Sequence, residues 1–371
     1  MAGIYVHIPF CARRCIYCGF FSTVRQDEAA RYVNALCREL ELRKDYLAGA
    51  PVKTFYFGGG TPSRLAPEQI GQILSAIDSA LGLSNLEELT VECNPDDITH
   101  QYVAALRALG VNRISMGVQT FNPELLSFLH RRHTATQALE AVRICRESGI
   151  TNNSIDLMYG LPGQTLDMFR DDLQIALSTG VQHISSYCLS YEENTPLQVL
   201  RDQGRLTLAD DDLCSRMFTL MCDTLREGGF EHYEISNFCR SGFQSRHNSS
   251  YWDGTPYLGL GAGAHSYNGN SRQWNPSDLD AYMQGIEQNS PQFEVDHLYA
   301  TDLYNEKLML SLRTTKGLDL SELSTPDRLS VLKSAEALLS NGSLQLDNNH
   351  LRIPESRMFI SDSIISTLFD D

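Results

Sequence analysis

The sequence predicts an α/β fold whose first half is a parallel sheet. Six short apolar segments alternate with five longer amphipathic ones, which is the pattern of βα units joined by right-handed crossovers. The short segments are rich in β-branched and apolar residues, as strands covered on both faces are. A closed eight-stranded barrel would need two more βα units. We therefore expect a partial (β/α)6 barrel or an open doubly wound sheet over residues 1–200.

The elements of this half are marked by boundary signals as well as by periodicity. Strands are expected at residues 3–9, 53–58, 88–93, 113–119, 154–160 and 183–190. Helices are expected at residues 27–47, 67–82, 98–109, 135–148 and 166–179. Pro67 begins the second helix, and Asp97 is expected to cap the third. Gly110 and Gly149 stand where helices end in a left-handed residue.

The regular alternation of strand and helix segments ends at about residue 200. Residues 201–300 are expected to form a connecting α/β region. In it Asp210 begins a helix that ends near Gly228, and the strand-like segment 232–238 precedes a polar and aromatic loop. Residues 301–371 are expected to form a small helical domain, with a winged helix as the candidate architecture and a hairpin turn at 347–349.

Composition restricts the partners of the chain. Its 371 residues carry 30 Lys and Arg against 46 Asp and Glu, a formal net charge of −16, so the overall positive charge typical of nucleic-acid binding is missing. No apolar run is long enough for a transmembrane helix, and no secretion signal is expected at the N-terminus. Ten cysteines without such a signal are typical of reduced thiols. We expect a cytoplasmic protein that binds no nucleic acid.

Polar and glycine-rich segments follow most of the predicted strands. They read CARRC, GGGTP, CNPDD, QTFNP and YGLPGQ in chain order. Loops at the carboxyl ends of parallel strands share one edge of the sheet, and α/β proteins have their active and ligand-binding sites at that edge. We therefore expect one functional rim.

Three cysteines in the first of these loops form a metal-ligand pattern. Cys11, Cys15 and Cys18 have the spacing C-x3-C-x2-C, and thiolate ligands favour zinc or an iron–sulfur cluster. No fourth cysteine lies nearby, so a [4Fe–4S] cluster would keep one iron without a protein ligand. The alternative is a structural zinc site that uses His7 as its fourth ligand. The spacing and the position after the first strand favour the cluster.

This cysteine loop resembles the signature of the radical S-adenosylmethionine (SAM) superfamily, including the aromatic Tyr17 before the last cysteine. The resemblance implies a partial (β/α)6 barrel in which SAM binds the open iron. The triple glycine at 58–60 likewise resembles the loop with which that superfamily binds the SAM amino group. As a phosphate-binding loop the same segment fails, because no Gly-Lys-Ser/Thr follows it.

Further motifs narrow the resemblance to the group that contains oxygen-independent coproporphyrinogen III oxidase and the HemW heme chaperones. They include YVHIPFCARRCIYC, FGGGTPS, VECNPDD, ISMGVQTF, RRHTATQA, DLMYGLPGQT, YEISNF, RHNSSYW and YLGLGAGAHSY, and they span nearly the whole chain. The resemblance implies that Tyr17 packs on adenine. It implies SAM contacts at Tyr5, Gly59, Gly60, Thr61, Glu92, Gln119, Arg131 and Asp156.

Two departures from the oxidase pattern favour the chaperones. The oxidase has a fourth cysteine two residues after the third, where this chain has Phe20, and it carries an N-terminal extension, whereas ten residues precede Cys11 here. The HNxxYW motif that begins at His247 is associated with HemW and heme binding. A neutral imidazole is a common axial ligand of heme iron, so His247 is the candidate ligand, with His265 second and Arg246 as a propionate partner.

Three functions follow from these observations as hypotheses. The first is a heme chaperone that binds heme, a [4Fe–4S] cluster and SAM, and delivers heme to a respiratory hemoprotein. It would involve transient contact with a membrane surface and a possible homodimer. The second is the oxidase itself, which performs SAM-dependent oxidative decarboxylation of coproporphyrinogen III to protoporphyrinogen IX. The third is a binding module in which the cysteine triplet holds structural zinc.

Overall fold

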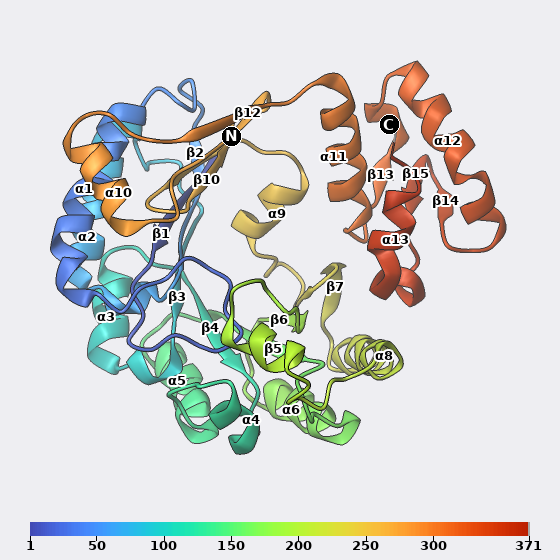
Figure 1. The fold of residues 1–371 in the computed structure, drawn as a ribbon, viewed down its shortest axis with the longest axis horizontal. Coiled ribbons are helices and arrows are strands. Elements are labelled where there is room, and N and C mark those ends of the chain that lie inside the picture. The colour runs from blue at the N-terminus through green and yellow to red at the C-terminus, as the bar shows by residue number, and fades with distance from the viewer. Residues whose placement is uncertain (370–371) are drawn as a thin grey trace.

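The parallel sheet predicted from the sequence is the centre of the molecule. A computed structural model describes residues 1–369, and in this part of the chain twelve strands form one sheet in the order β12-β11-β10-β9-β1-β2-β3-β4-β5-β6-β8-β7. Six neighbouring strands pair in parallel and in sequence order, so the predicted partial (β/α)6 barrel is confirmed (Figure 1). They are β1 (Ala2–Ile8), β2 (Val52–Gly59), β3 (Glu88–Cys93), β4 (Arg113–Gln119), β5 (Asn152–Tyr159) and β6 (His183–Cys188).

The segment after residue 200 extends both edges of this sheet. At one edge, β9 (Tyr257–Leu260) pairs in parallel with β1. The antiparallel strands β10 (His265–Tyr267), β11 (Ser271–Trp274) and β12 (Glu294–His297) follow it. At the other edge, β8 (Asn237–Cys239) and β7 (Glu231–Glu234) pair antiparallel beside β6. The single strand expected at 232–238 is therefore wrong, because the chain turns between β7 and β8.

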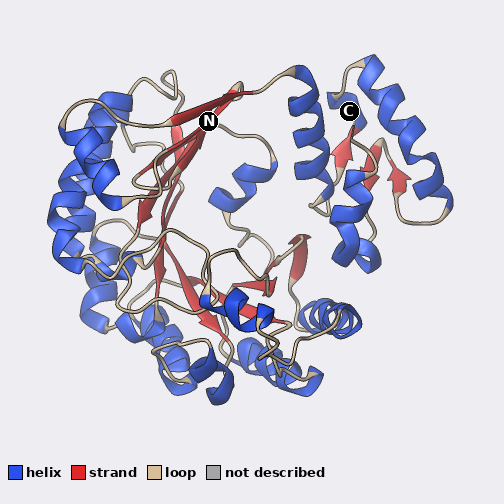
Figure 2. Cartoon of the chain, in the orientation of Figure 1, coloured by secondary structure: helices blue, strands red, loops and turns tan. Residues whose placement is uncertain are grey.

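Helices cover the outer face of the curved sheet (Figure 2). The side chains that the strands point toward these helices are fully buried, as the stacked rings of Phe55 and Phe57 show, with centroids 4.6 Å apart. The helices that follow the parallel strands and their extensions are α1 (Ala29–Arg43), α2 (Pro67–Leu81), α3 (His100–Ala108), α4 (Pro123–Phe128), α5 (Ala135–Glu147), α6 (Leu166–Ser178), α7 (Pro196–Asp202), α8 (Asp211–Glu227) and α10 (Leu279–Glu287).

A buried charge network joins α1 to the loop after β9. Glu39 is fully buried and accepts hydrogen bonds from Arg43 Nη1 at 2.8 Å and from the Tyr282 hydroxyl at 2.7 Å. It also accepts one from the Gly261 N–H at 2.8 Å. Arg43 donates in turn to the Gly259 carbonyl at 2.9 Å. Such additional hydrogen bonds offset the cost of burying an ion pair, and here they hold the glycine-rich loop against the barrel.

Two helix predictions need correction. The cap of α3 is Thr99, whose hydroxyl accepts from the Tyr102 N–H at 3.1 Å, whereas Asp97 lies in a preceding 3₁₀ turn and pairs with Arg132 at 3.0 Å. The polar segment expected as a loop after residue 238 contains helix α9 (Arg246–Trp252). This helix contacts β2 and lies on the inner side of the sheet (Figure 1).

The last part of the chain forms a small sheet with its own helices. The elements are α11 (Ala300–Leu312), β13 (Leu318–Asp319), α12 (Thr325–Ser340), β14 (Gln345–Asp347), β15 (His350–Arg352) and α13 (Ser361–Ser366), with strand order β13-β15-β14. The hairpin turn expected at 347–349 is confirmed, with Asn348 and Asn349 at positive φ. The domain boundaries at residues 200 and 300 and the winged-helix architecture stay predictions.

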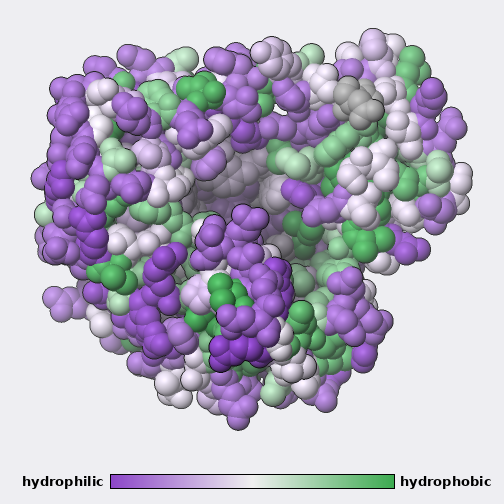
Figure 3. Space-filling model, viewed as in Figure 1, coloured by the Kyte–Doolittle hydropathy of each residue, from purple (hydrophilic) through white to green (hydrophobic). Residues whose placement is uncertain are grey.

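Figure 3 shows that the face of the molecule seen in Figure 1 is hollowed at its centre. Within residues 1–369, no helix is long and apolar enough to cross a membrane.

Candidate cluster and cofactor site

The carboxyl ends of the parallel strands surround one cavity of about 660 Å³. Most of the residues that the sequence singled out lie in its wall. They are Cys11, Cys15, Tyr17, Cys18, Gly59, Gly60, Thr61, Glu92, Gln119, Arg131 and Asp156. The strand-end loops therefore meet at one rim, as expected. Phe20 also lines this cavity and is 66% exposed.

The three loop cysteines are free, half-buried thiols that face this cavity. A backbone hydrogen bond from the Cys11 N–H to the Thr23 carbonyl (2.8 Å) ties the loop to the chain that follows it. At least two of the three sulfur atoms lie more than 4.8 Å apart. A single zinc ion draws its ligands to about 3–4 Å apart. The wider spacing fits three different iron corners of a [4Fe–4S] cluster better.

His7, the fourth ligand of the zinc alternative, is held by other groups. Its Nε2 bonds the Phe21 carbonyl at 2.8 Å, and its Nδ1 bonds the Tyr5 hydroxyl at 3.1 Å. Burial lowers the pKa of His7 to about 4, so the ring is neutral. With both nitrogens bonded, His7 supports the wall of the site and does not complete a Cys₃His set.

The glycines after β2 allow two loops to lie in direct contact. Gly59 has φ +108°, and a Cβ there would stand 2.5 Å from the His7 ring. A Cβ on Gly60 would stand 2.7 Å from the backbone of Pro9. Only glycine fits both positions, and their bare backbone lies open to the cavity. Thr61 follows, and its hydroxyl lies 3.4 Å from Cys11 Sγ.

Two half-buried carboxyl groups line the cavity. Glu92 at the end of β3 accepts hydrogen bonds from the Tyr56 hydroxyl (2.7 Å) and the Gly59 N–H (3.2 Å). Burial raises its pKa to about 7, against the lowering effect of those bonds. Asp156 in β5 accepts from the Ser115 hydroxyl at 3.4 Å, and burial raises its pKa to about 6. Both groups are poised to ionise fully when a cationic ligand enters.

Arg131 connects the cysteine loop to the ends of β3 and β4. Its guanidinium donates to Cys15 Sγ at 3.4 Å, to Asn94 Oδ1 at 2.7 Å and to the Gly117 carbonyl. The Arg131 Nε atom is buried and lacks a hydrogen-bond partner, so the side chain keeps one donor for a ligand. Gln119 stands beside it at a β-bulge with φ +70°.

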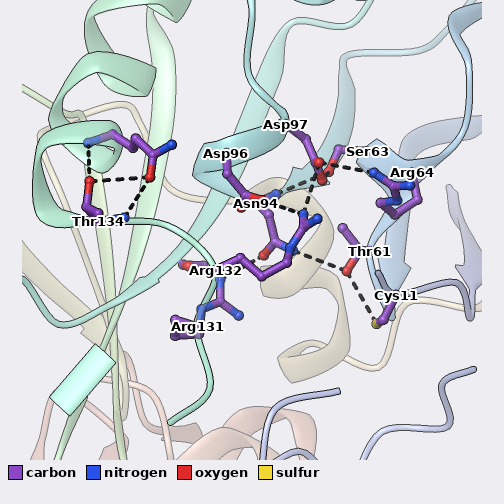
Figure 4. Close-up of polar contacts among 12 residues, drawn as sticks. Cys11, Thr61, Ser63, Arg64, Asn94, Asp96, Asp97, Arg131, Arg132 and Thr134 are labelled. Carbon is purple, nitrogen blue, oxygen red and sulfur yellow. Dashed lines mark hydrogen bonds and ion pairs between the residues drawn. The ribbon is translucent and has the colours of Figure 1, made fainter. Parts of the chain in front are cut away.

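Asn94 is a site residue that the sequence reasoning missed. Its amide bridges Arg131 and the Thr61 hydroxyl, with Nδ2 3.4 Å from Thr61 Oγ1 (Figure 4). The rim rule could have identified it, because Asn94 is the first residue after β3. Beside it, Asp97 holds the adjacent loops together by accepting from Ser63 at 2.8 Å and pairing with Arg132.

Tyr5 is absent from the wall of the cavity. Its ring stacks on Tyr56 at 6.2 Å and 25°, and its hydroxyl supports His7. Tyr5 therefore touches the groups that shape the site.

His247 lies inside the barrel, away from that cavity. It is fully buried, with Nδ1 2.9 Å from the Thr54 hydroxyl and Nε2 2.9 Å from the Tyr251 hydroxyl. Its ring stacks on Tyr56 at 5.1 Å, and burial lowers its pKa to about 3. The carboxylate of Glu88 accepts the His247 N–H at 2.9 Å at the start of α9. In this conformation neither ring nitrogen is open to a heme iron.

The other two candidate heme contacts are on the surface. Arg246 is exposed and pairs with Glu87. His265 in β10 is exposed and stacks on Trp274 at 5.8 Å and 22°. Since neither of its nitrogens has a described hydrogen bond, His265 is open to a ligand without any change in the fold.

Comparisons with known proteins agree with this geometry. Residues 5–176 match the Radical SAM superfamily, and residues 298–359 match the HemN C-terminal domain. A Mycobacterium tuberculosis protein named heme chaperone HemW is 34% identical across 99% of this chain and 94% of its own length. The chain belongs to the HemW family. A Bacillus subtilis protein of the same name is 37% identical across 85% of this chain and 84% of its own length.

A solved structure shows that the fold of this HemW-family chain is shared with the oxidase. Coproporphyrinogen III oxidase (HemN) from Escherichia coli superposes with a TM-score of 0.85 at 24% identity, covering 99% of this chain and 90% of that one. The radical SAM domain implies a [4Fe–4S] cluster and SAM, and the residues at the rim fit both. Three thiols suit the cluster, and bare backbone with two carboxyl groups suits an amino acid and ribose hydroxyls.

Proposed function

We propose that this protein is a heme chaperone, which binds heme together with SAM and a [4Fe–4S] cluster and passes the heme to respiratory hemoproteins. The observation that carries the proposal is the identity of 34–37% with proteins named heme chaperone HemW over most of the chain. Phe20 agrees with it, because an exposed phenyl ring stands at the mouth of the cavity where the oxidase pattern has a fourth cysteine.

In this proposal Cys11, Cys15 and Cys18 hold the cluster, which supplies electrons and an open iron for SAM. The backbone of Gly59 and Gly60 would bind the amino group of SAM. The remaining contacts proposed for SAM are Thr61, Glu92, Gln119, Arg131 and Asp156, with Tyr17 packed on adenine and Tyr5 supporting the wall. Ionised carboxylates bind the ammonium group and ribose hydroxyls more strongly than neutral ones do.

His247 remains the proposed axial ligand of heme, and the structure defines what this requires. The hydrogen bond between Nε2 and the Tyr251 hydroxyl must break, and the fully buried ring must become accessible, before Nε2 can meet iron. His265 is the second candidate, since it is already exposed. Hemin titration of cluster-loaded His247→Ala and His265→Ala variants, followed by the Soret band, separates the two. Loss of the Soret band in His265→Ala but not in His247→Ala would overturn the assignment of His247 as the axial ligand.

The oxidase remains the second candidate function, because its fold is shared over 99% of the chain. We would incubate anaerobically reconstituted, SAM-loaded protein with coproporphyrinogen III and reductant, beside an active oxidase as control. The chaperone proposal expects no protoporphyrinogen from a protein with about four irons per chain. Turnover would overturn it.

The partners are part of the same proposal. Delivery to a respiratory hemoprotein requires transient contact with a membrane surface, and loading with heme is proposed to form a homodimer. A cytoplasmic location is proposed because the ten cysteines are all free thiols in the described structure.

A further inference from the structure

A second group of metal-ligand side chains lies far from the cysteine loop, where the C-terminal part of the chain meets the barrel. Cys222 comes from α8, His232 from β7 and Glu355 from the 3₁₀ segment Glu355–Ile360. One ligand atom from each lies within 4.8 Å of the other two, and no other group of three or more such residues in 1–369 does so. Two consecutive elements, α8 and β7, therefore meet a segment that lies 123 residues after His232, and together they bring a thiol, an imidazole and a carboxylate into one place.

Two of the three side chains, those of Cys222 and His232, are shielded from water, whereas the Glu355 side chain is 33% exposed. Cys222 is 4% exposed, and the His232 side chain is 6% exposed. The His232 ring stacks on Phe238, with centroids 4.2 Å apart, and Phe218 packs against its edge. The ring is therefore fixed in position by its neighbours, as metal-ligating imidazoles are.

The hydrogen bonds of the group leave a buried atom unexplained. His232 Nδ1 bonds Glu355 Oε1 at 2.9 Å, and Arg226 pairs with the other carboxylate oxygen. His232 Nε2 is buried with no hydrogen-bond partner. A buried ring nitrogen without a partner is costly and is often the sign of a bound ion or water. An ion pair that joins α8 to the C-terminal part accounts for Glu355 and Arg226, but not for the Cys222 thiol beside them.

We propose that Cys222, a ring nitrogen of His232 and Glu355 form a zinc site that fastens the C-terminal part of the chain to α8 and β7. A sulfur, a nitrogen and an oxygen ligand together match the preference of Zn²⁺. With Zn–S of about 2.3 Å and Zn–N of about 2.0 Å, a tetrahedral ion separates its ligand atoms by about 3–4 Å. Shifts of about 1 Å would therefore close the present group around an ion, and water would take the fourth position.

The charges around the group are compatible with this ion. A thiolate and a carboxylate balance the two charges of zinc, and Arg226 stays on the outer carboxylate oxygen. Glu355 lies within the segment 298–359 that matches the HemN C-terminal domain, so the ion would link that domain to the sheet edge formed by β7. The proposal is independent of the proposed heme function.

The test measures iron and zinc together in the full-length, cluster-loaded protein after incubation with zinc chloride and dialysis. We expect about one zinc per chain beside about four irons, with a zinc absorption-edge spectrum that shows one sulfur and otherwise nitrogen and oxygen ligands. Counting iron shows that zinc has not displaced the cluster. Two or three sulfurs around zinc, or no retained zinc at full iron occupancy, would overturn the proposal.

Variants assign the zinc to these residues. Cys222→Ala and His232→Gln are expected to retain the iron and lose the zinc, whereas Cys145→Ala, a buried cysteine of α5, keeps both. Zinc should also raise the melting temperature of the wild type and of Cys145→Ala but not of the two ligand variants. Zinc held equally by all of them refutes the site. If a ligand variant loses iron as well, Glu355→Gln, at a partly exposed position, decides the same question.

Discussion

The Tyr56 hydroxyl controls how much of Glu92 is ionised, and removing it should weaken SAM binding in a pH-dependent way. The hydroxyl donates to the Glu92 carboxylate at 2.7 Å, and with this bond in place burial leaves the pKa of Glu92 at about 7. A hydrogen bond to a charged group contributes about 1.5–3 kcal/mol. Since 1.36 kcal/mol is one pKa unit, Tyr56→Phe should raise the pKa by roughly 1–2 units.

The magnitude follows from the ionised fraction. At pH 7 about half of Glu92 is ionised in the wild type, and about 1–10% would be ionised in Tyr56→Phe. If SAM binds the ionised form, its affinity at pH 7 should fall roughly 5- to 50-fold. At pH 9 the wild type is almost fully ionised and the variant at least half, so the deficit should shrink to about twofold or less.

Anaerobic calorimetric titration of cluster-loaded protein with SAM at pH 7 and pH 9 measures this directly. Tyr102→Phe is the matched control, because its hydroxyl contacts the Leu65 carbonyl and not Glu92. A deficit of equal size at both pH values would refute the reasoning, since it would mean that Tyr56 acts through packing and not through the charge of Glu92.

Three further changes test the wall and its support. Gly59→Ala should destabilise the cluster loop by at least about 1–3 kcal/mol and lower iron occupancy, because φ is +108° and the new Cβ meets His7 at 2.5 Å. Arg131→Lys should speed iron loss to a chelator roughly 10- to 100-fold, because an ammonium cannot reach Cys15, Asn94 and Gly117 together. Glu39→Gln should cost about 3–5 kcal/mol in chemical unfolding, because it leaves the charge of Arg43 buried and unpaired.

Each of these has a control of the same chemistry. Gly82→Ala also forces an alanine into positive φ, but nothing lies within 4 Å of its Cβ, so it should keep its iron. Arg107→Lys changes an exposed arginine on α3 and should release iron at the wild-type rate. Glu41→Gln, exposed on α1, should leave stability unchanged. Equal effects of variant and control in any pair would contradict the contacts assigned here.

The barrel was predictable because its signals are local. Apolar strand segments and the polar residues that end them recur in each βα unit, so the rim followed from topology alone. The cap of α3 was mistaken because Asp97 and Thr99 are both good capping residues, and the choice depends on ion pairs with Arg132 that only the folded chain brings together.

Helix α9 could not be predicted for a similar reason. Its first two N–H groups, those of Arg246 and His247, donate hydrogen bonds to the carboxylate of Glu88, which lies 158 residues before Arg246 in the sequence. From the sequence alone, His247 looks like an exposed ligand in a polar loop. Only its contacts in the folded chain, the stacked Tyr56 ring and the Thr54 hydroxyl, show that it is buried inside the barrel. The zinc group was equally hidden, because Cys222, His232 and Glu355 have no common spacing.

The proposed role of this protein is to hand heme to another protein. The most direct test mixes heme-loaded, cluster-loaded protein with membrane vesicles that carry heme-depleted respiratory hemoproteins, and follows their reduced-minus-oxidised spectrum. The chaperone account predicts that cytochrome bands appear while the Soret band of the carrier falls, faster than with the same amount of free hemin. Cytochrome bands that form no faster than with free hemin, while the carrier keeps its heme, would contradict it.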